Sequence, residues 1–374
     1  MKIVHIIVCL DKGGAEKILF DLVTKTQSIQ VENIIISLTS IGYYGQMLQE
    51  RGVTVIPLNL KKNHILSLFL LRNVMKRYKP DLICSWLYHA NFISIFCRLL
   101  GYKNIVWNIH NTYLPWKTSS KVTFFLNRIC SKLSFIPKRI IYCADKAKKV
   151  HVELGYNLNR SVVIYNGYDL GHYLINNEWR NKIRMELNIS QHELVIGHVA
   201  RYNSAKDHKN FIQALKIVFE RCNTLSLKVI MVGNDIDEQN IELINILKEN
   251  QLLDRVMLLG IRSDVNFLYN AMDVFVLSSS EEAFPNVIAE AMASGVPCVV
   301  TEAGDAGNII GDCGILVPIK NSLELANGMI TMLNFSPEKR AGLSYDSRMR
   351  ITNLFDIDKM IHNYLRIYTE ILHD

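Results

Sequence analysis

Two glutamates at a fixed spacing are the residues of this chain best suited to hold a sugar or a ribose. Glu282 and Glu290 have seven residues between them, in the stretch 278–295. A strand over 273–278 is predicted to run into this stretch, and Glu290 falls on a helix of small residues. Carboxylates repel phosphate but accept hydrogen bonds from hydroxyls. The pair therefore suits the sugar part of a phosphorylated ligand.

The same stretch predicts a phosphate site. A strand that ends in a loop which opens a helix is where open α/β sheets bind phosphorylated ligands. The helix start near Asn286 offers free backbone N–H groups and a partial positive charge, which suit a diphosphate. Glu290 is flanked by apolar and small residues, so its burial would require a partner. The alternative is that this carboxylate points to solvent from a surface helix.

Two cations follow another predicted strand. Arg201 comes directly after the strand 194–200, and Lys206 lies five residues further on. The two could converge on one diphosphate and neutralise the charge that builds on a leaving nucleotide. Two solvated loop cations are the alternative, and taken alone they are the commoner case.

The first half of the chain has a glycine pair and two histidines of interest. Gly13 and Gly14 follow the first predicted strand, with Glu16 two residues later, and glycines let backbone N–H groups approach a ligand closely. A plain strand-to-helix turn is the alternative, and the third glycine of a dinucleotide fingerprint is missing. His110 ends the strand 104–110 and could point into a cleft, although a lone histidine is more often structural. His89 is a weaker candidate for an acceptor side.

Short apolar runs alternate with helical patterns, which is typical of parallel α/β architecture. A chain of 374 residues suits two domains. Strands are predicted near 2–9, 32–38, 53–58, 81–86, 104–109, 139–143, 161–165, 194–200, 227–232, 256–259, 273–278, 297–301 and 315–317. A turn over 165–169 separates the two series, so the domains are expected at 1–167 and 168–354. A final amphipathic helix is predicted over about 355–373.

Together these motifs resemble the retaining glycosyltransferases of family 4 over nearly the whole chain. The resemblance rests on the Glu-x7-Glu pair, the Arg-x4-Lys pair, the Gly-Gly-x-Glu loop and the linker Asn166-Gly167-Tyr168-Asp169. It implies the GT-B fold, in which two Rossmann-like domains face each other across a cleft. It also implies that the last helix, 355–374, packs back on the first domain.

The resemblance implies a role for each site residue. Glu290 would bind the ribose, Glu282 the transferring sugar, Arg201 and Lys206 the diphosphate, and His110 the donor sugar. The other donor contacts would come from Gly233, Ile261, Arg262, Phe284, Pro285, Asn286, Val287 and Ile288. Gly13, Gly14, Glu16 and His89 would line the acceptor side. Ala283 stands where the family usually has glycine, and its methyl group would narrow the sugar pocket.

The composition and the distribution of charge indicate the environment in which the protein works. None of the eight cysteines forms a C-x-x-C pair or clusters with histidines, which indicates reduced core thiols and no structural metal. No apolar run is long enough for a membrane helix, and the N-terminus indicates a buried strand and not a signal peptide. Residues 1–165 carry 23 Lys and Arg against 8 Asp and Glu, whereas the remainder carries 19 against 27. The basic half, and above all the stretch 117–149, is expected to face something anionic.

The resulting hypothesis is a metal-independent, retaining glycosyltransferase without cofactor. It would move a hexose or N-acetylhexosamine from a nucleotide diphosphate sugar, with UDP-sugar as the commonest case. The acceptor would be a lipid-linked glycan of bacterial surface polysaccharide, reached by a cytoplasmic protein at the anionic inner face of the membrane. Two rivals remain open: a sugar-nucleotide epimerase of the same fold, for which no convincing acid and base set is found, and a nucleic-acid-binding protein, for which no binding motif is found.

Overall fold

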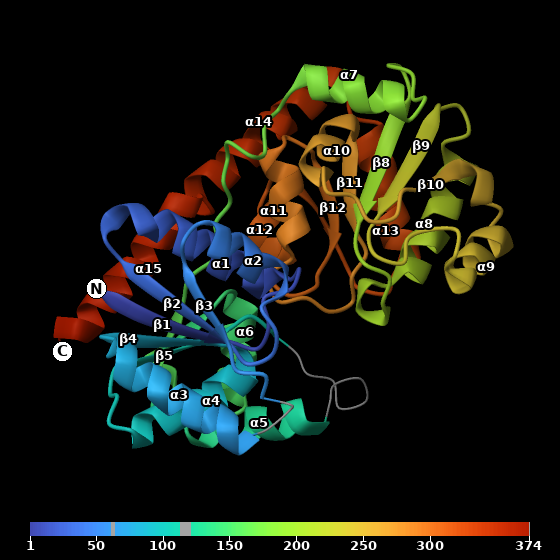
Figure 1. Ribbon diagram of the computed structural model, residues 1–374. Helices are drawn as coiled ribbons and strands as arrows, with labels where there is room; N and C mark the ends of the chain where they lie inside the picture. Colours follow the sequence, from blue (N-terminus) through green and yellow to red (C-terminus); the bar gives the residue numbers. More distant parts are fainter. Residues whose placement is uncertain (61–63, 113–120, 374) are drawn as a thin grey trace. The chain divides into compact units, whose positions relative to one another are not determined.

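The chain forms two compact units. The computed structural model describes residues 1–60, 64–112 and 121–373 (Figure 1). One unit comprises Met1–Gly167 with Asp358–Asp374, and the other comprises Tyr168–Ile357. Both are parallel α/β units, as the alternation of strand and helix predicts, and the chain has the two Rossmann-like domains that the resemblance implies.

The first unit is built on a seven-stranded parallel sheet in the order β3-β2-β1-β4-β5-β6-β7. Its strands are β1 (Lys2–Ile7), β2 (Glu32–Ser37), β3 (Thr54–Pro57), β4 (Leu82–Trp86), β5 (Ile105–Ile109), β6 (Arg139–Tyr142) and β7 (Ser161–Val163). β1, β4 and β5 are almost wholly buried, which explains why they read as continuous apolar runs instead of alternating ones.

Helices cover both faces of this sheet. They are α1 (Gly14–Thr26), α2 (Gly42–Glu50), α3 (His64–Tyr78), α4 (Leu87–Leu99), α5 (Lys121–Lys132) and α6 (Asp145–Glu153). In Figure 1, α1 and α2 lie on one side of the strands and α3 and α4 on the other. Right-handed crossovers produce this arrangement, because the strand order runs in opposite directions from β1 and from β4.

The last helix, α15 (Ile357–His373), packs on the first sheet through Tyr364. Its hydroxyl donates to Asn108 Oδ1 over 3.2 Å, and its ring stacks on Trp86 at 6.1 Å. The helix begins two residues later than the predicted 355, because Asp356 forms an isolated β-bridge with Tyr168. Its buried stripe includes Met360, Tyr364 and Tyr368, as the helical spacing predicts.

The second unit is built on a six-stranded parallel sheet in the order β10-β9-β8-β11-β12-β13. Its strands are β8 (Leu194–Val199), β9 (Leu227–Val232), β10 (Val256–Leu258), β11 (Val274–Leu277), β12 (Cys298–Thr301) and β13 (Gly314–Val317). Its helices are α7 (Asn177–Glu186), α8 (His208–Arg221), α9 (Ile241–Glu249), α10 (Val265–Ala271), α11 (Asn286–Ala293), α12 (Ala306–Ile310), α13 (Ser322–Leu333) and α14 (Pro337–Leu354). All thirteen predicted strands are therefore present in the two sheets.

Each sheet has one point at which the strand order reverses. In the first unit it lies between β1 and β4, and in the second between β8 and β11. In open α/β sheets, ligands bind at such a reversal point, outside the carboxyl ends of the strands. Most of the predicted site residues follow one of these four strands.

The cysteines are free thiols, as their spacing in the sequence predicted. All eight cysteines are free, and six of them are buried. Of the helices in the described ranges, none is long and apolar enough to cross a membrane.

Candidate active site

The loops after β8 and β11 are joined at the reversal point of the second sheet. The loop after β8 contains a single 3-10 turn, η3 (Ser204–Lys206). The backbone N–H of Ser280, just beyond β11, donates to the carbonyl of Ala205 over 2.8 Å. This bond brings Lys206 and Glu282, which are 76 residues apart in sequence, to the same edge of the sheet.

Lys206 and Glu282 form an ion pair there. The ammonium contacts Glu282 Oε1, which also accepts a hydrogen bond from Ser279 Oγ over 2.8 Å. Only 19% of the lysine side chain and 11% of the glutamate side chain are exposed, so solvent screens the pair weakly. Arg201 lies on the same loop and is exposed. Lys206 is thus neutralised by Glu282, a pairing that the sequence did not predict.

Helix α11 begins shortly after Glu282 in the sequence, and its start has no side-chain cap. Pro285 is the N-cap residue, and α11 makes no side-chain capping bond. The Asn286 side chain accepts a hydrogen bond from the Tyr168 hydroxyl over 2.6 Å. Phe284 is buried against Tyr168 and Phe355. The Phe284 ring is therefore part of the core, and the backbone is the part of this residue that suits a ligand.

Val287 and Ile288 form the first turn of α11 after Asn286. Ile288 is fully buried, whereas Val287 is half-buried. An uncapped first turn carries backbone donors and a partial positive charge, which favour an anion. This turn therefore has the chemistry that the sequence predicted for a diphosphate.

Glu290 has the partner that its apolar surroundings require. Its Oε2 accepts a hydrogen bond from the hydroxyl of Tyr269, on α10, over 2.9 Å. Burial, and after it the nearby carboxylate, raises the pKa of Tyr269 well above its usual value, so the phenol stays protonated and acts as the donor. Glu290 is half-buried, and its position is fixed on the helix that begins at the proposed phosphate site.

Gly233, at the end of β9, packs directly against the loop after β8. A Cβ added there would lie 2.0 Å from the carbonyl oxygen of Ala200, and φ is +153°. Its N–H donates to the carbonyl of Gly260, beyond β10, over 2.9 Å. Only glycine satisfies both the dihedral angle and the contact. The residue therefore lets three loops approach one another next to Arg201.

Ile261 and Arg262 lie beyond that contact. The Ile261 side chain is exposed. The Arg262 guanidinium donates two hydrogen bonds to Asp264, over 2.8 and 2.7 Å, and one to Glu186 over 2.8 Å. These bonds raise the pKa of Arg262 further above its usual value. Since Nε and both terminal nitrogens are held by carboxylates, we expect a contact to a nucleotide to come from the backbone of this turn.

In the first unit, the glycine loop lies between β1 and α1. Gly13 is the N-cap of α1, and Gly14 is its first residue. The Glu16 carboxylate folds back over Gly13, because a Cβ added to the glycine would lie 2.2 Å from Glu16 Oε2. Cys9 Sγ donates to the other carboxylate oxygen over 3.6 Å. A carboxylate thus lies at the positive end of α1, where it is favoured electrostatically.

The two candidate histidines of the first unit follow β4 and β5. His110 stacks on Trp86 with a centroid separation of 5.3 Å, and its Nε2 is buried without a hydrogen-bond partner in the described part of the chain. Burial lowers its pKa to about 4, so the ring is neutral at physiological pH. His89 lies in the first turn of α4, and burial lowers its pKa as well. It follows Leu87, a non-glycine residue with a φ of +70° at the reversal point of the sheet.

Two family models match successive parts of the chain. The model described as Glycosyltransferase Family 4 matches residues 12–172, and that described as Glycosyl transferases group 1 matches residues 193–334. The chain belongs to the family 4, or group 1, glycosyltransferases.

Relatives of this glycosyltransferase are similar along most of their length. The putative glycosyltransferase EpsF of Bacillus subtilis is 24% identical, over 95% of this chain and 96% of its own. The UDP-Gal:alpha-D-GlcNAc-diphosphoundecaprenol alpha-1,3-galactosyltransferase of Escherichia coli is 24% identical, over 82% of this chain and 79% of its own. The structure of HepE from Anabaena in complex with UDP-glucose has a TM-score of 0.85 and 23% identity, with 99% of this chain and 100% of that chain covered. The fold is therefore that of GT-B glycosyltransferases.

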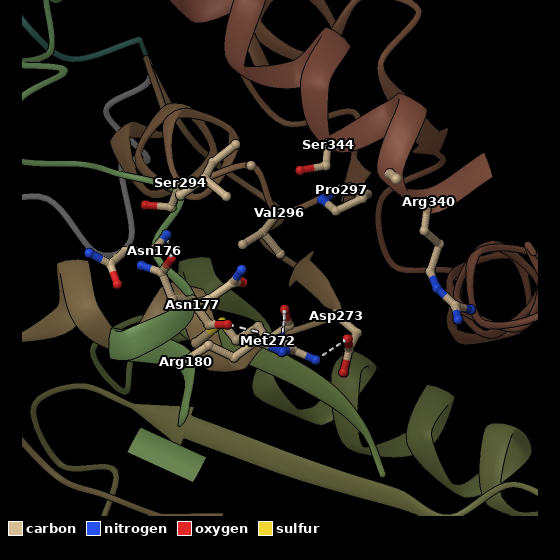
Figure 2. Close-up of a pocket in the computed structure, with 14 residues that line it drawn as sticks. Asn176, Asn177, Arg180, Met272, Asp273, Ser294, Val296, Pro297, Arg340 and Ser344 are labelled. Carbon is tan, nitrogen blue, oxygen red and sulfur yellow. Dashed lines mark hydrogen bonds and ion pairs between the residues drawn. The ribbon is translucent and has the colours of Figure 1, made fainter. Parts of the chain in front are cut away.

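A cavity of about 210 Å³ lies elsewhere in the second unit (Figure 2). Asp273 and Pro297, which line it, precede β11 and β12. The cavity is therefore at the amino edge of the sheet, opposite the edge that carries Lys206 and Glu282. It is too distant to belong to the site described above.

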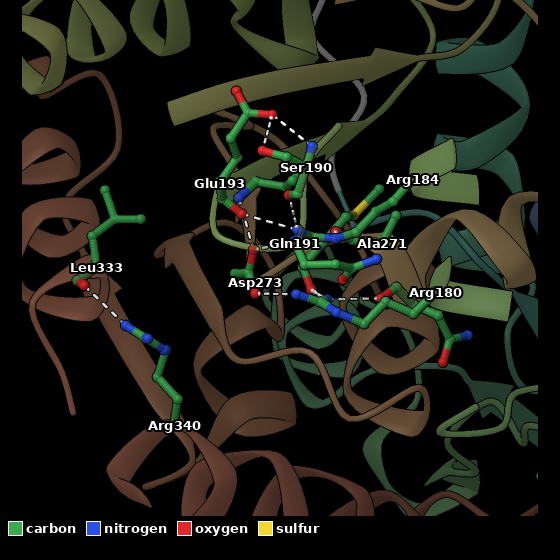
Figure 3. Close-up of polar contacts among 12 residues, drawn as sticks. Arg180, Arg184, Ser190, Gln191, Glu193, Ala271, Asp273, Leu333 and Arg340 are labelled. Carbon is green, nitrogen blue, oxygen red and sulfur yellow. Dashed lines mark hydrogen bonds and ion pairs between the residues drawn. The ribbon is translucent and has the colours of Figure 1, made fainter. Parts of the chain in front are cut away.

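The cations around this cavity are engaged by the protein itself. Arg180 donates to the carbonyl of Asn270 over 3.0 Å and to Asp273 over 2.8 Å, and Arg184 contacts the other oxygen of Asp273 over 2.7 Å (Figure 3). Arg340 donates to backbone carbonyls at the end of α13. These bonds cap the ends of helices and strands. The cavity is a structural crevice of this glycosyltransferase.

Three partners of the predicted residues were missed from the sequence: Ser279, Tyr269 and Tyr168. Ser279 is three residues from Glu282, so a short serine run next to a loop carboxylate was an available signal. Tyr269 and Tyr168 come from other elements, α10 and the linker, and no spacing in the sequence indicates their contacts.

Proposed function

We propose that this glycosyltransferase transfers a sugar from a nucleotide diphosphate sugar, with UDP-sugar as its donor, to an acceptor hydroxyl with retention of configuration. The observation that carries the proposal is the Lys206–Glu282 ion pair at the reversal point of the second sheet, on the loop that leads into α11. In the proposal, the lysine of this pair would bind phosphate and the carboxylate would bind a sugar hydroxyl.

The donor would span the residues of the second unit in order. The ribose hydroxyls would donate to Glu290, which Tyr269 holds in position. The diphosphate would accept hydrogen bonds from Arg201, Lys206 and the N–H groups at the start of α11. The sugar hydroxyls would donate to Glu282, and the loop at Gly233 would leave room for the nucleotide.

In the reaction, the bond between the anomeric carbon and the diphosphate oxygen breaks, and the acceptor oxygen forms its bond on the same face of the sugar. The acceptor proton passes to the departing phosphate oxygen. Arg201, Lys206 and the partial charge of α11 stabilise the negative charge on that phosphate, so no metal ion and no cofactor is needed. His110, which is neutral and whose Nε2 has no hydrogen-bond partner among the described residues, would hold a hydroxyl of the donor sugar.

The acceptor is proposed to be a lipid-linked glycan. The E. coli relative is named for a diphosphoundecaprenol-linked acceptor, and a Campylobacter jejuni relative is named in the same way. Gly13, Gly14, Glu16 and His89, at the loops of the first unit, would meet this acceptor.

The basic helix α5 supports contact with an anionic membrane surface. Lys121, Arg128 and Lys132 are exposed, together with Val122 and Phe125. Phe125 thus lies on the exposed face of the helix with the cations. A face that mixes basic and large apolar side chains suits the membrane interface. Residues 117–120 of the predicted basic stretch lie outside the described residues.

The reaction class is tested on the product. The enzyme would be incubated with a UDP-sugar and a bacterial lipid extract in the presence of EDTA, and the new linkage would be examined by proton NMR. Retention of the donor's anomeric configuration, unaffected by EDTA, is expected. An inverted linkage, or activity that EDTA abolishes, would refute the mechanism while leaving the family intact.

A further inference from the structure

A buried hydroxyl joins the end of β11 to the backbone of Lys206. Ser278, the first residue after β11, is fully buried. Its Oγ donates to the carbonyl oxygen of Lys206 over 2.7 Å and lies 3.2 Å from Nε2 of His198, on β8. Ser278 holds the backbone of the lysine of the proposed phosphate site and is itself in contact with His198, and neither residue is among the site residues predicted from the sequence.

The direction of these bonds fixes the state of the histidine. A serine hydroxyl has one hydrogen, and Ser278 directs it to the Lys206 carbonyl. The serine oxygen must therefore accept from His198, so the histidine carries its proton on Nε2. The other ring nitrogen, Nδ1, has no partner in the described part of the chain. Burial lowers the pKa of His198 well below its usual value, which keeps the ring neutral.

The histidine ring is held rigidly by its neighbours. It stacks on Phe211, with centroids 4.6 Å apart and planes 21° apart, and it meets the edge of His208 at 5.0 Å. His198 itself is 1% exposed. Ring packing alone would not require a hydrogen-bond donor here, whereas the serine oxygen can be held only by a donor. The imidazole therefore contributes a direction to the hydrogen bond in addition to packing.

Ser278 holds the carbonyl of Lys206, while the N–H of Lys206 donates to the carbonyl oxygen and Oδ1 of Asn203 over 3.1 and 3.2 Å. Lys206 ends a single 3-10 turn, and the next residue, Asp207, has a φ of +47°, a left-handed conformation that is unfavourable for a non-glycine residue. A lysine side chain is long and flexible, so its ammonium is positioned only if its backbone is.

We propose that Ser278 and His198 are positioning residues for Lys206, which hold its backbone so that the ammonium meets Glu282 in the free enzyme and the donor diphosphate in the complex. The inference rests on the proposed function. Neither residue touches substrate. Their effect on turnover would pass entirely through Lys206.

The test compares Ser278→Ala and His198→Phe with His198→Gln, which keeps an amide donor for the serine. Ser294→Ala is the matched control, because Ser294 is a buried serine of the same unit whose hydroxyl has no partner in the described chain. Turnover of a UDP-sugar, KM for the donor and the dissociation constant of UDP would be measured, each with a thermal unfolding curve. The first two variants are expected to lower kcat by about tenfold or more, while His198→Gln and Ser294→Ala stay within about threefold of wild type.

The decisive measurement is a double-mutant cycle. Because Ser278 acts through Lys206, Ser278→Ala should add almost nothing in a Lys206→Ala background, for both kcat and UDP binding. An equal factor in both backgrounds, or an equal loss in Ser294→Ala, would overturn the positioning role in favour of general destabilisation. A wild-type enzyme that binds UDP but transfers no sugar would refute the proposed function alone, because the cycle on UDP binding still reports on Lys206. A wild type that binds no nucleotide would overturn both.

Discussion

Replacing Glu282 by glutamine should make the protein bind UDP more tightly and transfer sugar more slowly. In the free protein the carboxylate neutralises Lys206, and the two side chains are only 11% and 19% exposed. A diphosphate must therefore displace Glu282 from the ammonium. The amide of glutamine still accepts the hydrogen bond from Ser279 but has no charge to compete with phosphate.

The size of both effects follows from the contact. Hydrogen bonds to charged groups contribute about 1.5–3 kcal/mol. In wild type, UDP must replace Glu282 as the partner of Lys206, and part of this hydrogen-bond free energy is lost. If Glu282→Gln recovers roughly 1 kcal/mol of it, UDP binds about fivefold more tightly to the variant than to wild type. UDP has no sugar, so the loss of the contact between Glu282 and the sugar does not affect the binding of UDP. For a UDP-sugar the transition state loses a charged acceptor, and turnover should fall by roughly 10- to 100-fold.

The assay is calorimetric titration with UDP alongside steady-state release of UDP from the donor. Glu281→Gln is the control, since it makes the same chemical change at an exposed neighbouring residue. It should alter neither quantity. Weaker UDP binding in Glu282→Gln, with an unchanged unfolding temperature, would refute the idea that Glu282 and the diphosphate compete for Lys206.

Four further outcomes are expected. Arg201→Ala should lower turnover by about 100-fold with an unchanged circular dichroism spectrum, because the residue acts on the leaving group; unfolding of the variant would contradict this. Glu290→Gln should weaken UDP binding by about tenfold in titration, because a charged acceptor for the ribose is lost, and unchanged binding would remove Glu290 from the site. Gly233→Ala should lower the unfolding temperature and weaken UDP binding together, since φ is +153° and its carbonyl contact leaves no room for a methyl group; a fully active, stable variant would contradict the contact. The unfolding temperature should fall as the pH drops from about 6.5 towards 4, because burial lowers the pKa of His5 and His151 to about 4 and the unfolded chain binds protons first; a flat profile in calorimetry over this range would contradict their burial.

The sequence predicted the strands well because each is a short apolar run bounded by turn residues. β1 and β11 are buried along almost their whole length, which leaves a strong signal. Helix boundaries were less exact: α15 begins at Ile357 because a bridge between Tyr168 and Asp356 replaces its first turn, and such a long-range pair leaves no local pattern.

The candidate site was predictable where it depends on residue type and order along the chain. Glu282 lies in the loop that follows β11, and Glu290 lies on α11, as expected. The contacts between elements were not predictable. That Lys206 is neutralised by Glu282, or that Tyr269 holds Glu290, depends on how β8, α10 and α11 pack in three dimensions. On α5, the helical period alone did not determine which face is buried, and Phe125 lies on the exposed one.

The central claim is tested most directly by nucleotide release from a panel of UDP-, GDP- and ADP-sugars, with and without a bacterial membrane lipid extract, for wild type and Glu282→Ala. The account predicts release from a UDP-sugar that rises with the lipid and is lost in the variant. No release from any donor, with no nucleotide binding by titration, would contradict it.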